Sequence, residues 1–370
     1  MTANTAEIID ISDNPIYESG AEVAPGIRRI TSVDATPHLE LLPPRGSSDT
    51  PFTAVDKDVH FTLGDAYDEL RTLSRDNHDR VVSLRDVSSV TASTIKIGNQ
   101  THPMNNIAAR ALCSRYEIPY KYIRSIPHYL QSINLNHALI QHRDDEIFVR
   151  FNGDKVRGLF STRYVPMDHV QIVKALMDAG VNPNKRVQLE VDYTLMRLSL
   201  VDAQRTFEVG HNDPHTPGIS IVNSELGQSS FSIAPYVLRL VCTNGLITKV
   251  PGTATNFRHI SDRALTRMPQ ILSMAYERVD DQQKQLHIAT QRPVEQPEET
   301  LKTFARHFSL DKDQREAIAW ALPYEISLDG TNTMFNIIQV LTKAAQCKDL
   351  TTEQNTHLQQ VGGEVLRLVE

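Results

Sequence analysis

Residues 149–164 read VRFNGDKVRGLFSTRY. In this stretch apolar and basic side chains alternate on both sides of the dipeptide Asn152-Gly153. An Asn-Gly dipeptide between two alternating runs is the strongest short-range signal of a β-hairpin, because both residues tolerate the positive φ that the turn needs. We therefore expect residues 137–165 to form an antiparallel strand pair that turns at Asn152-Gly153.

The same kinds of signal continue outward from this hairpin. Residues 186–201 and 218–249 read as further strand pairs, and the second carries an Asn-Gly turn at 244–245. Residues 167–180, MDHVQIVKALMDAG, read as an amphipathic helix that Gly180 closes. Because hairpins dominate and no β-α-β order appears, the predicted fold class is α+β, with an antiparallel β-sheet whose hairpins pack against helices, and a helical C-terminal region.

The composition predicts four parts along the chain. Residues 1–55 are rich in Pro, Ser, Thr, Glu and Asp and are expected to be a mostly disordered acidic arm, in which Ile8, Ile9 and Ile11 form a short apolar patch that could dock elsewhere. Residues 56–290 form the α+β core, with one long helix over 258–290; residues 291–300 form a linker, and 301–370 form a helical C-terminal region.

Charge is unevenly distributed although the net charge is −7. Residues 1–100 hold 9 Lys and Arg against 16 Asp and Glu, residues 101–270 hold 19 against 14, and residues 271–370 hold 10 against 15. A basic middle between acidic flanks indicates polyanion binding. The alternative is chance variation around neutrality.

The first basic group lies on or beside the predicted hairpin. It comprises Arg150, Lys155, Arg157 and Arg163, and Tyr164 beside it could stack on a base. Lys and Arg side chains along a groove neutralise phosphates and release counterions, which gives sequence-independent, salt-sensitive binding. The alternative is a solvated strand face on which the arginine stems cover apolar surface, with Tyr164 packed in the core.

The second basic group lies later in the core and comprises Arg239, Lys249, Arg258, Arg263 and Arg267. Two of them, Arg263 and Arg267, stand four residues apart and so share one face of a helix. The alternative here is helix solvation combined with ion pairs to acidic neighbours. Together the two basic groups are the predicted DNA-binding residues.

No motif for catalysis, cofactor binding or metal binding stands out. The chain contains no P-loop, no dinucleotide-binding glycine motif and no nucleophile elbow. Residues 144–146, Asp-Asp-Glu, read as an acidic turn, and His211 with His215 in a Pro- and Gly-rich loop has no third metal ligand. The polar loop 223–230 reads as turn geometry. We therefore expect a non-enzymatic protein without cofactor or metal.

The cysteines and the N-terminus suggest where the protein works. Cys113, Cys242 and Cys347 are far apart and form no paired motif, which fits a reducing cytoplasm. The first residues lack a basic segment followed by an apolar one, so no secretory signal is expected. No run approaches the roughly 18 apolar residues of a membrane span, so no membrane partner is expected.

Several motifs together resemble a known family. The segments VRGLFSTRYVPMDHVQIVKAL, NSELGQSSFSI and LVCTNGLIT, followed by FRHISDRALTRM and TMFNIIQVLTKAAQ, resemble the phage- and plasmid-associated domain-of-unknown-function family 932 over residues 55–345. The fold is also similar, more remotely, to the Rad-type and lambda Red-beta single-strand annealing proteins. That resemblance implies a ring-type homo-oligomer that holds single-stranded DNA in a basic groove.

The expected function follows from charge, architecture and this resemblance. We expect a single-stranded DNA-binding protein that promotes strand annealing and homologous recombination, or repair, of a phage, plasmid or bacterial genome. Recombination proteins or single-strand-binding proteins are the expected protein partners. Two alternatives stay open: a metal-dependent nuclease, and a structural or protein-interaction protein of a mobile element without DNA affinity.

Overall fold

The structure is a computed structural model that describes residues 60–210, 213–240, 244–247, 256–259, 261, 263–327 and 330–369. The predicted acidic arm of residues 1–55 lies outside the described residues, as does Lys249. Among the described residues no helix is both long and apolar enough to cross a membrane.

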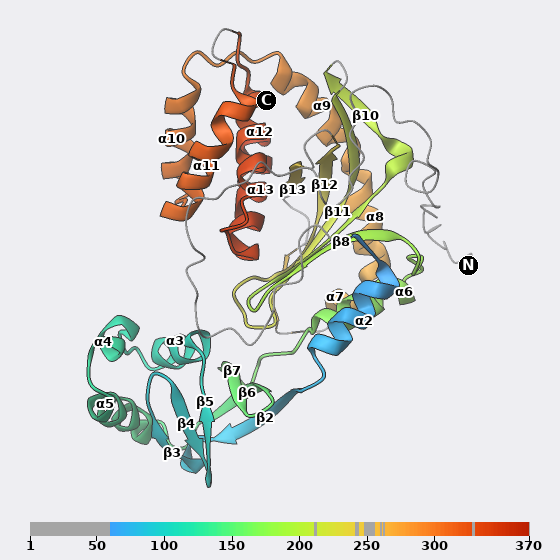
Figure 1. The fold of residues 1–370 in the computed structure, drawn as a ribbon. Coiled ribbons are helices and arrows are strands. Elements are labelled where there is room, and N and C mark those ends of the chain that lie inside the picture. The colour runs from blue at the N-terminus through green and yellow to red at the C-terminus, as the bar shows by residue number, and fades with distance from the viewer. Residues whose placement is uncertain are drawn as a thin grey trace.

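A large antiparallel sheet forms the centre of the fold (Figure 1). Its strand order is β1-β8-β9-β11-β12-β13, while β10 also pairs with β11 and β14 with β12. The strands are β1 (His60–Thr62), β8 (Arg186–Val191), β9 (Met196–Val201), β10 (Phe207–Gly210), β11 (Asp213–Asn223), β12 (Phe231–Arg239), β13 (Asn244–Ile247) and β14 (Asn256–Phe257). The predicted α+β class with an antiparallel sheet is therefore confirmed.

Helices cover both faces of this sheet, which explains why every residue of β11 is buried. One core contains Ile219, Ile221 and the apolar sides of α2 (Leu63–Leu73), α6 (His169–Asp178), α7 (Arg263–Thr266) and α8 (Met268–Glu277). The other contains Val237, Leu246 and the apolar sides of α9 (Val279–Thr290), α10 (Pro297–His307), α11 (Lys312–Glu325), α12 (Met334–Ala344) and α13 (Thr352–Arg367). The predicted helical C-terminal region thus packs on one face of the central sheet.

A small lobe, residues 77–161, is inserted between α2 and α6 and has its own apolar core (Figure 1). One of its sheets has the order β2-β6-β7 and the other β3-β4-β5. Its elements are β2 (Asn77–Ser83), β3 (Val87–Val90), β4 (Thr94–Ile97), β5 (Gln100–Pro103), α3 (Asn106–Arg115), α4 (Tyr120–Ser125), α5 (His128–Gln141), β6 (Glu146–Asn152) and β7 (Lys155–Ser161). Short 3-10 turns follow β2 (Leu84–Asp86) and β9 (Ala203–Arg205).

The hairpin at the centre of the sequence is confirmed in part. Strands β6 and β7 pair antiparallel, and Gly153 adopts a φ of 57° at the turn. The prediction that the strand begins near residue 137 is wrong, because α5 continues to Gln141. Gln131, Leu135 and Leu139 recur every four residues on its buried side, and this helical period determines the element. Gly180, with φ of 95°, follows α6 as predicted.

Four other expectations need correction. Residues 258–290 form α7, α8 and α9 rather than one helix, and α10 already begins at Pro297, inside the expected linker. Asn244 and Gly245 are not a turn but lie in β13, opposite Arg239 and Leu238. The expected loop around His215 is the start of β11, which tolerates Pro214 and Pro217 within a buried strand.

A side chain on Gly218 of β11 would collide with the backbone of β9, so it should destabilise the sheet. A Cβ atom at this position would lie 2.1 Å from the carbonyl oxygen of Leu200 and 2.8 Å from the Cα of Val201. Both are backbone atoms and cannot rotate away. We expect Gly218→Ala to lower the free energy of unfolding by about 1–3 kcal/mol. Urea unfolding measures this change. An unchanged free energy of unfolding would contradict the prediction, because it would mean that β9 and β11 can move apart to admit the methyl group at no energetic cost.

Candidate nucleic-acid interface and the buried junction beside it

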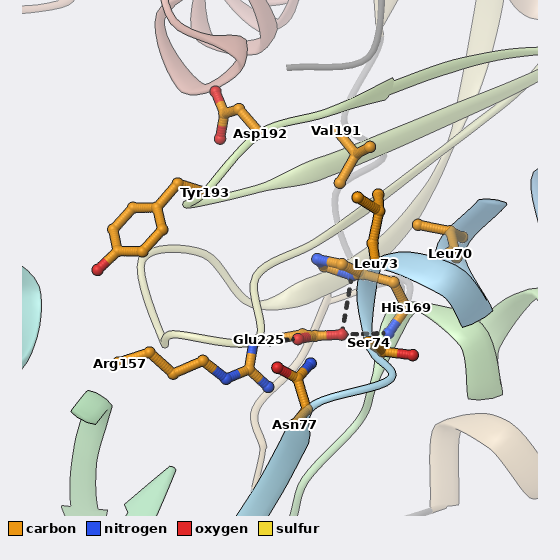
Figure 2. A pocket seen from close by; sticks show the side chains of 10 residues that line it. All are labelled: Leu70, Leu73, Ser74, Asn77, Arg157, His169, Val191, Asp192, Tyr193 and Glu225. Carbon is orange, nitrogen blue, oxygen red and sulfur yellow. Dashed lines mark hydrogen bonds and ion pairs between the residues drawn. The ribbon is translucent and has the colours of Figure 1, made fainter. Parts of the chain in front are cut away.

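Glu225 connects the large sheet to the small lobe. It lies in the loop after β11 with only 6% of its side chain exposed. One carboxylate oxygen accepts a 2.6 Å hydrogen bond from Arg157 Nη1, and the other accepts a 2.8 Å bond from the backbone N–H of His169. A single carboxylate therefore holds together β7, the start of α6 and the β11–β12 loop (Figure 2).

Arg150 is the most deeply buried cation of this junction, with 1% of its surface exposed. Its guanidinium donates to Asp79 at 3.0 Å, to Asp168, and to the carbonyl oxygen of Glu225 at 3.2 Å. Burial alone would lower the pKa of Arg150, but the carboxylates of Asp168 and Glu225, with Tyr164 and Asp79, raise it above its ordinary value. Arg150 is thus a permanently charged structural link.

The charges around Glu225 decide its protonation. Burial by itself would raise the pKa of this carboxyl, but His169, Arg157 and Arg150 together lower it below its ordinary range. Burial also lowers the pKa of His169. A carboxylate that accepts charge-assisted hydrogen bonds in a dry site is held strongly in its ionised form.

Tyr164 belongs to the same junction and is half-buried. Its hydroxyl donates to the carbonyl oxygen of Glu225 at 3.0 Å and lies 3.0 Å from Nδ1 of His259. Its ring stacks on Phe160, with centroids 4.0 Å apart, and on His259, at 5.4 Å. Burial raises the pKa of Tyr164 to about 12. These contacts describe a packing residue rather than an open stacking platform.

A small pocket lies against this junction (Figure 2). Its polar lining includes Arg157, His169, Asn77 and Asp192. Nε and Nη2 of Arg157 are buried and have no hydrogen-bond partner among the residues that the structure describes. The pocket is large enough to hold an ordered water molecule.

Four predicted cations lie outside this buried junction and form what we call the exposed arginine patch: Arg163, Arg258, Arg263 and Arg267. The backbone N–H of Val165 donates to the carbonyl oxygen of His259 at 2.8 Å, which places Arg163 and Arg258 on adjoining segments. Arg263 and Arg267 follow one helical turn apart, at α7 and directly after it. Among the described residues, no ion pair occupies any of these four guanidinium groups.

The remaining predicted residues are placed differently. Arg239 is 15% exposed and bridges Asp213, at 2.7 Å, and Glu325, at 2.8 Å. Lys155 is half-buried at the start of β7. The structure therefore separates the predicted DNA-binding residues into a buried, paired set and an exposed set, a division that the sequence did not indicate. It also brings in His169, Glu225 and Asp168, which carried no role in the sequence interpretation.

The acidic residues of the expected acidic turn also have partners. Asp144 accepts from Arg85 Nε at 3.0 Å, and Asp145 lies 3.5 Å from His142. His215 is buried and its Nδ1 lies 2.9 Å from the carbonyl oxygen of Asp213. Within the described ranges, no three His, Cys, Asp or Glu residues come together in a way that could hold a metal ion.

Acid should weaken the fold, because two buried histidines resist protonation. Burial lowers the pKa of His215 and of His259 from 6.5 to about 4. The unfolded chain therefore takes up protons between pH 6.5 and 4 that the folded chain does not, so stability is complete above pH 6.5 and falls as the pH falls toward 4. The lowered pKa of Glu225 extends this loss below pH 4.5.

The expected slope is roughly 2–3 kcal/mol per pH unit where both histidines titrate. Urea unfolding at pH 7.5, 6.0, 5.0 and 4.5 measures it. Replacing His259 by Asn should reduce the slope by about half in this range. A free energy of unfolding that stays constant from pH 7.5 to 4.5 would contradict the burial of neutral imidazoles.

The chain matches the model of a known protein family. The model of a family described as domain of unknown function (DUF932) matches residues 157–363. This range begins at Arg157, includes the exposed arginine patch and the β11–β12 loop, and ends in α13. It leaves out most of the small lobe. No solved structure matches the chain.

Proposed function

Because the chain belongs to the DUF932 family, whose description assigns no function, we propose one from the structure: the protein binds single-stranded DNA through the exposed arginine patch. The observation that carries this proposal is that two stretches of chain, 163–165 and 258–267, meet through the hydrogen bond from Val165 to His259. Together they carry four exposed arginines without a carboxylate partner among the described residues. Such guanidinium groups are free to exchange water and counterions for phosphates.

The buried arginines have a different role in this proposal. The side chains of Arg150, Arg157 and Arg239 are at least 85% buried and already pair with carboxylates. A phosphate could reach them only by displacing those carboxylates, which would leave unpaired buried charges at a cost of several kcal/mol. We assign them to the architecture that holds the patch in place, since Arg150 lies against the ring of Tyr164, which directly follows Arg163 in the chain.

The form of the nucleic acid follows from the geometry of the patch. α7 has four residues and lies at the end of the large sheet nearer the small lobe (Figure 1), so it offers no long helix for a DNA groove. Arginines on a loop and a short helix suit a flexible strand that follows them phosphate by phosphate. Phe148 and Phe160, half-buried beside Tyr164, adjoin the patch.

The proposal extends to assembly and biological role. One protomer supplies about four phosphate contacts, so tight binding requires several protomers whose patches line one strand. We propose a non-enzymatic homo-oligomer that holds single strands and promotes their annealing in recombination, with a ring as the simplest closed form. Recombination and single-strand-binding proteins are its proposed partners.

Fluorescence anisotropy of a labelled oligo-dT strand, titrated at several salt concentrations, tests the proposal. Four phosphate contacts per site predict a slope of log K against log salt of about −3 per protomer, or about a 50-fold loss of affinity between 50 and 200 mM salt. A matched duplex should bind more weakly. Absence of binding at 50 mM salt, or affinity that salt does not change, would refute phosphate binding.

A further inference from the structure

Helix α5 carries exposed side chains with the spacing of a helix–helix contact. Tyr129, Ile133 and Ile140 are 65%, 62% and 64% exposed, and of the other described large apolar side chains only Leu368 is more than 60% exposed. Together with Asn136, the three recur at intervals of four, three and four residues. At about 100° per residue this places all four within about 60° of one another, as in the seam along which two α-helices interlock. We call these four residues the α5 stripe.

The α5 stripe is separate from the side of the helix that packs into the small lobe. The buried residues Gln131, Leu135 and Leu139 are centred about 130° around the helix from the stripe. The helix itself lies at the edge of the small lobe, away from the large sheet (Figure 1). An apolar stripe that is left open in this way is typical of a surface that a second molecule covers.

Charge changes sign from one end of α5 to the other. Lys121 and Arg124 are exposed on α4, which precedes α5, and between Glu117 and Asp144 the chain contains no acidic residue. Shortly after α5 come three exposed acidic residues, Asp144, Asp145 and Glu146. The 14 residues of α5 set the two groups about 20 Å apart. The surface along this helix therefore has a basic end and an acidic end.

A second copy of the chain fits this surface when the two α5 helices pack antiparallel. A two-fold axis across the middle of the helix places Ile133 of one protomer against Ile140 of its partner, and the reverse. The same axis brings the basic end of each helix to the acidic end of the other. A surface that complements itself in both apolar contacts and charge suits an isologous dimer.

We infer that the α5 stripe is a contact between two copies of this chain, packed antiparallel about a two-fold axis. A nucleic acid fits the length of the stripe less well, because the acidic end repels phosphates, while Tyr129 suits a protein interface, where tyrosine is enriched. The inference does not depend on the proposed DNA binding, although the dimer can be a building unit of the proposed homo-oligomer.

Sedimentation velocity of the full chain without DNA tests the contact. One helix pair forms a small interface, so the wild-type protein should associate reversibly in roughly the micromolar range. Ile133→Ser/Ile140→Ser should raise the dissociation constant at least about tenfold. Both positions are exposed, so this variant keeps the apolar core. Leu368→Ser, which replaces an equally exposed apolar residue in the C-terminal region, is the matched control and should associate like the wild type.

An exchange of charges tests the antiparallel arrangement. Lys121→Glu/Arg124→Glu makes both ends of the surface acidic, and Asp145→Lys/Glu146→Lys makes both ends basic. Asp144 is left unchanged because it pairs with Arg85. Each variant alone should associate more weakly than the wild type, whereas an equimolar mixture should restore dimers that contain one copy of each.

A wild-type protein that stays monomeric at high concentration, or self-association that the Ile133→Ser/Ile140→Ser variant retains in full, would overturn the inference. A mixture of the two charge variants that associates no better than either variant alone would overturn the antiparallel arrangement. Loss of oligo-dT binding in the isoleucine variant without any change in self-association would assign the stripe to nucleic acid instead.

Discussion

Replacing Glu225 by Gln is expected to lower the free energy of unfolding by about 3–5 kcal/mol, the usual cost of leaving a buried charge without its partner. Gln has nearly the shape of Glu, so packing is retained while the negative charge is lost. Arg157 would then stay charged in a site where only 5% of its surface is exposed. Two of its nitrogens already have no hydrogen-bond partner within the described part of the chain. Urea unfolding at pH 7.5 measures the change.

A matched substitution separates this effect from a general loss of acidity. Glu364 pairs with Arg367 at 2.7 Å, but its side chain is 30% exposed, so Glu364→Gln should cost at most about 1 kcal/mol. Adding Arg157→Met to Glu225→Gln should recover part of the lost stability, because the unpaired cation is removed. Equal effects of the two Gln substitutions would show that Glu225 does not hold the two sheets together.

Reversing the charge of Arg163 and Arg258 is expected to reduce the affinity for oligo-dT about 100-fold at low salt, while leaving the fold intact. Both side chains are exposed and unpaired among the described residues, so Arg163→Glu/Arg258→Glu breaks no observed ion pair. Removing two of four phosphate contacts should also reduce the salt slope by about half. Anisotropy titrations at 50, 100 and 200 mM salt measure both quantities.

The control for this variant carries the same change in net charge elsewhere. Arg306 and Arg315 are exposed on α10 and α11, on the C-terminal cover of the large sheet. Arg306→Glu/Arg315→Glu should lower affinity only by the weak long-range term that salt screens. If the two double variants bind equally, net charge rather than the exposed arginine patch governs binding.

Local pattern predicted much of the fold. The Asn152-Gly153 turn, the Gly180 cap and the strand pairs at 186–201 and 218–249 follow from alternation and turn chemistry, which act over a few residues. The wrong predictions arose where a short-range sequence signal competed with a stronger interaction between segments distant in sequence. Asn244-Gly245 has the composition of a turn, but pairing with β12 places it in a strand.

The division among the arginines could not be predicted in this way. Arg150, Arg157 and Arg163 look alike in an alternating stretch, and only partners remote in sequence distinguish them. Arg150 meets Asp79, 71 residues earlier, and Arg157 meets Glu225, 68 residues later. Glu225, the single acidic residue in the loop between β11 and β12, is the sequence signal that could have indicated a buried partner.

Ultraviolet cross-linking of a bromodeoxyuridine-substituted single strand to the full chain, with the cross-linked peptides identified by mass spectrometry, tests the central claim most directly. The account predicts cross-links in the peptides that contain Arg163 and residues 256–267, and their loss in the Arg163→Glu/Arg258→Glu variant. Cross-links confined to other surfaces, or cross-links that persist unchanged in that variant, would contradict it.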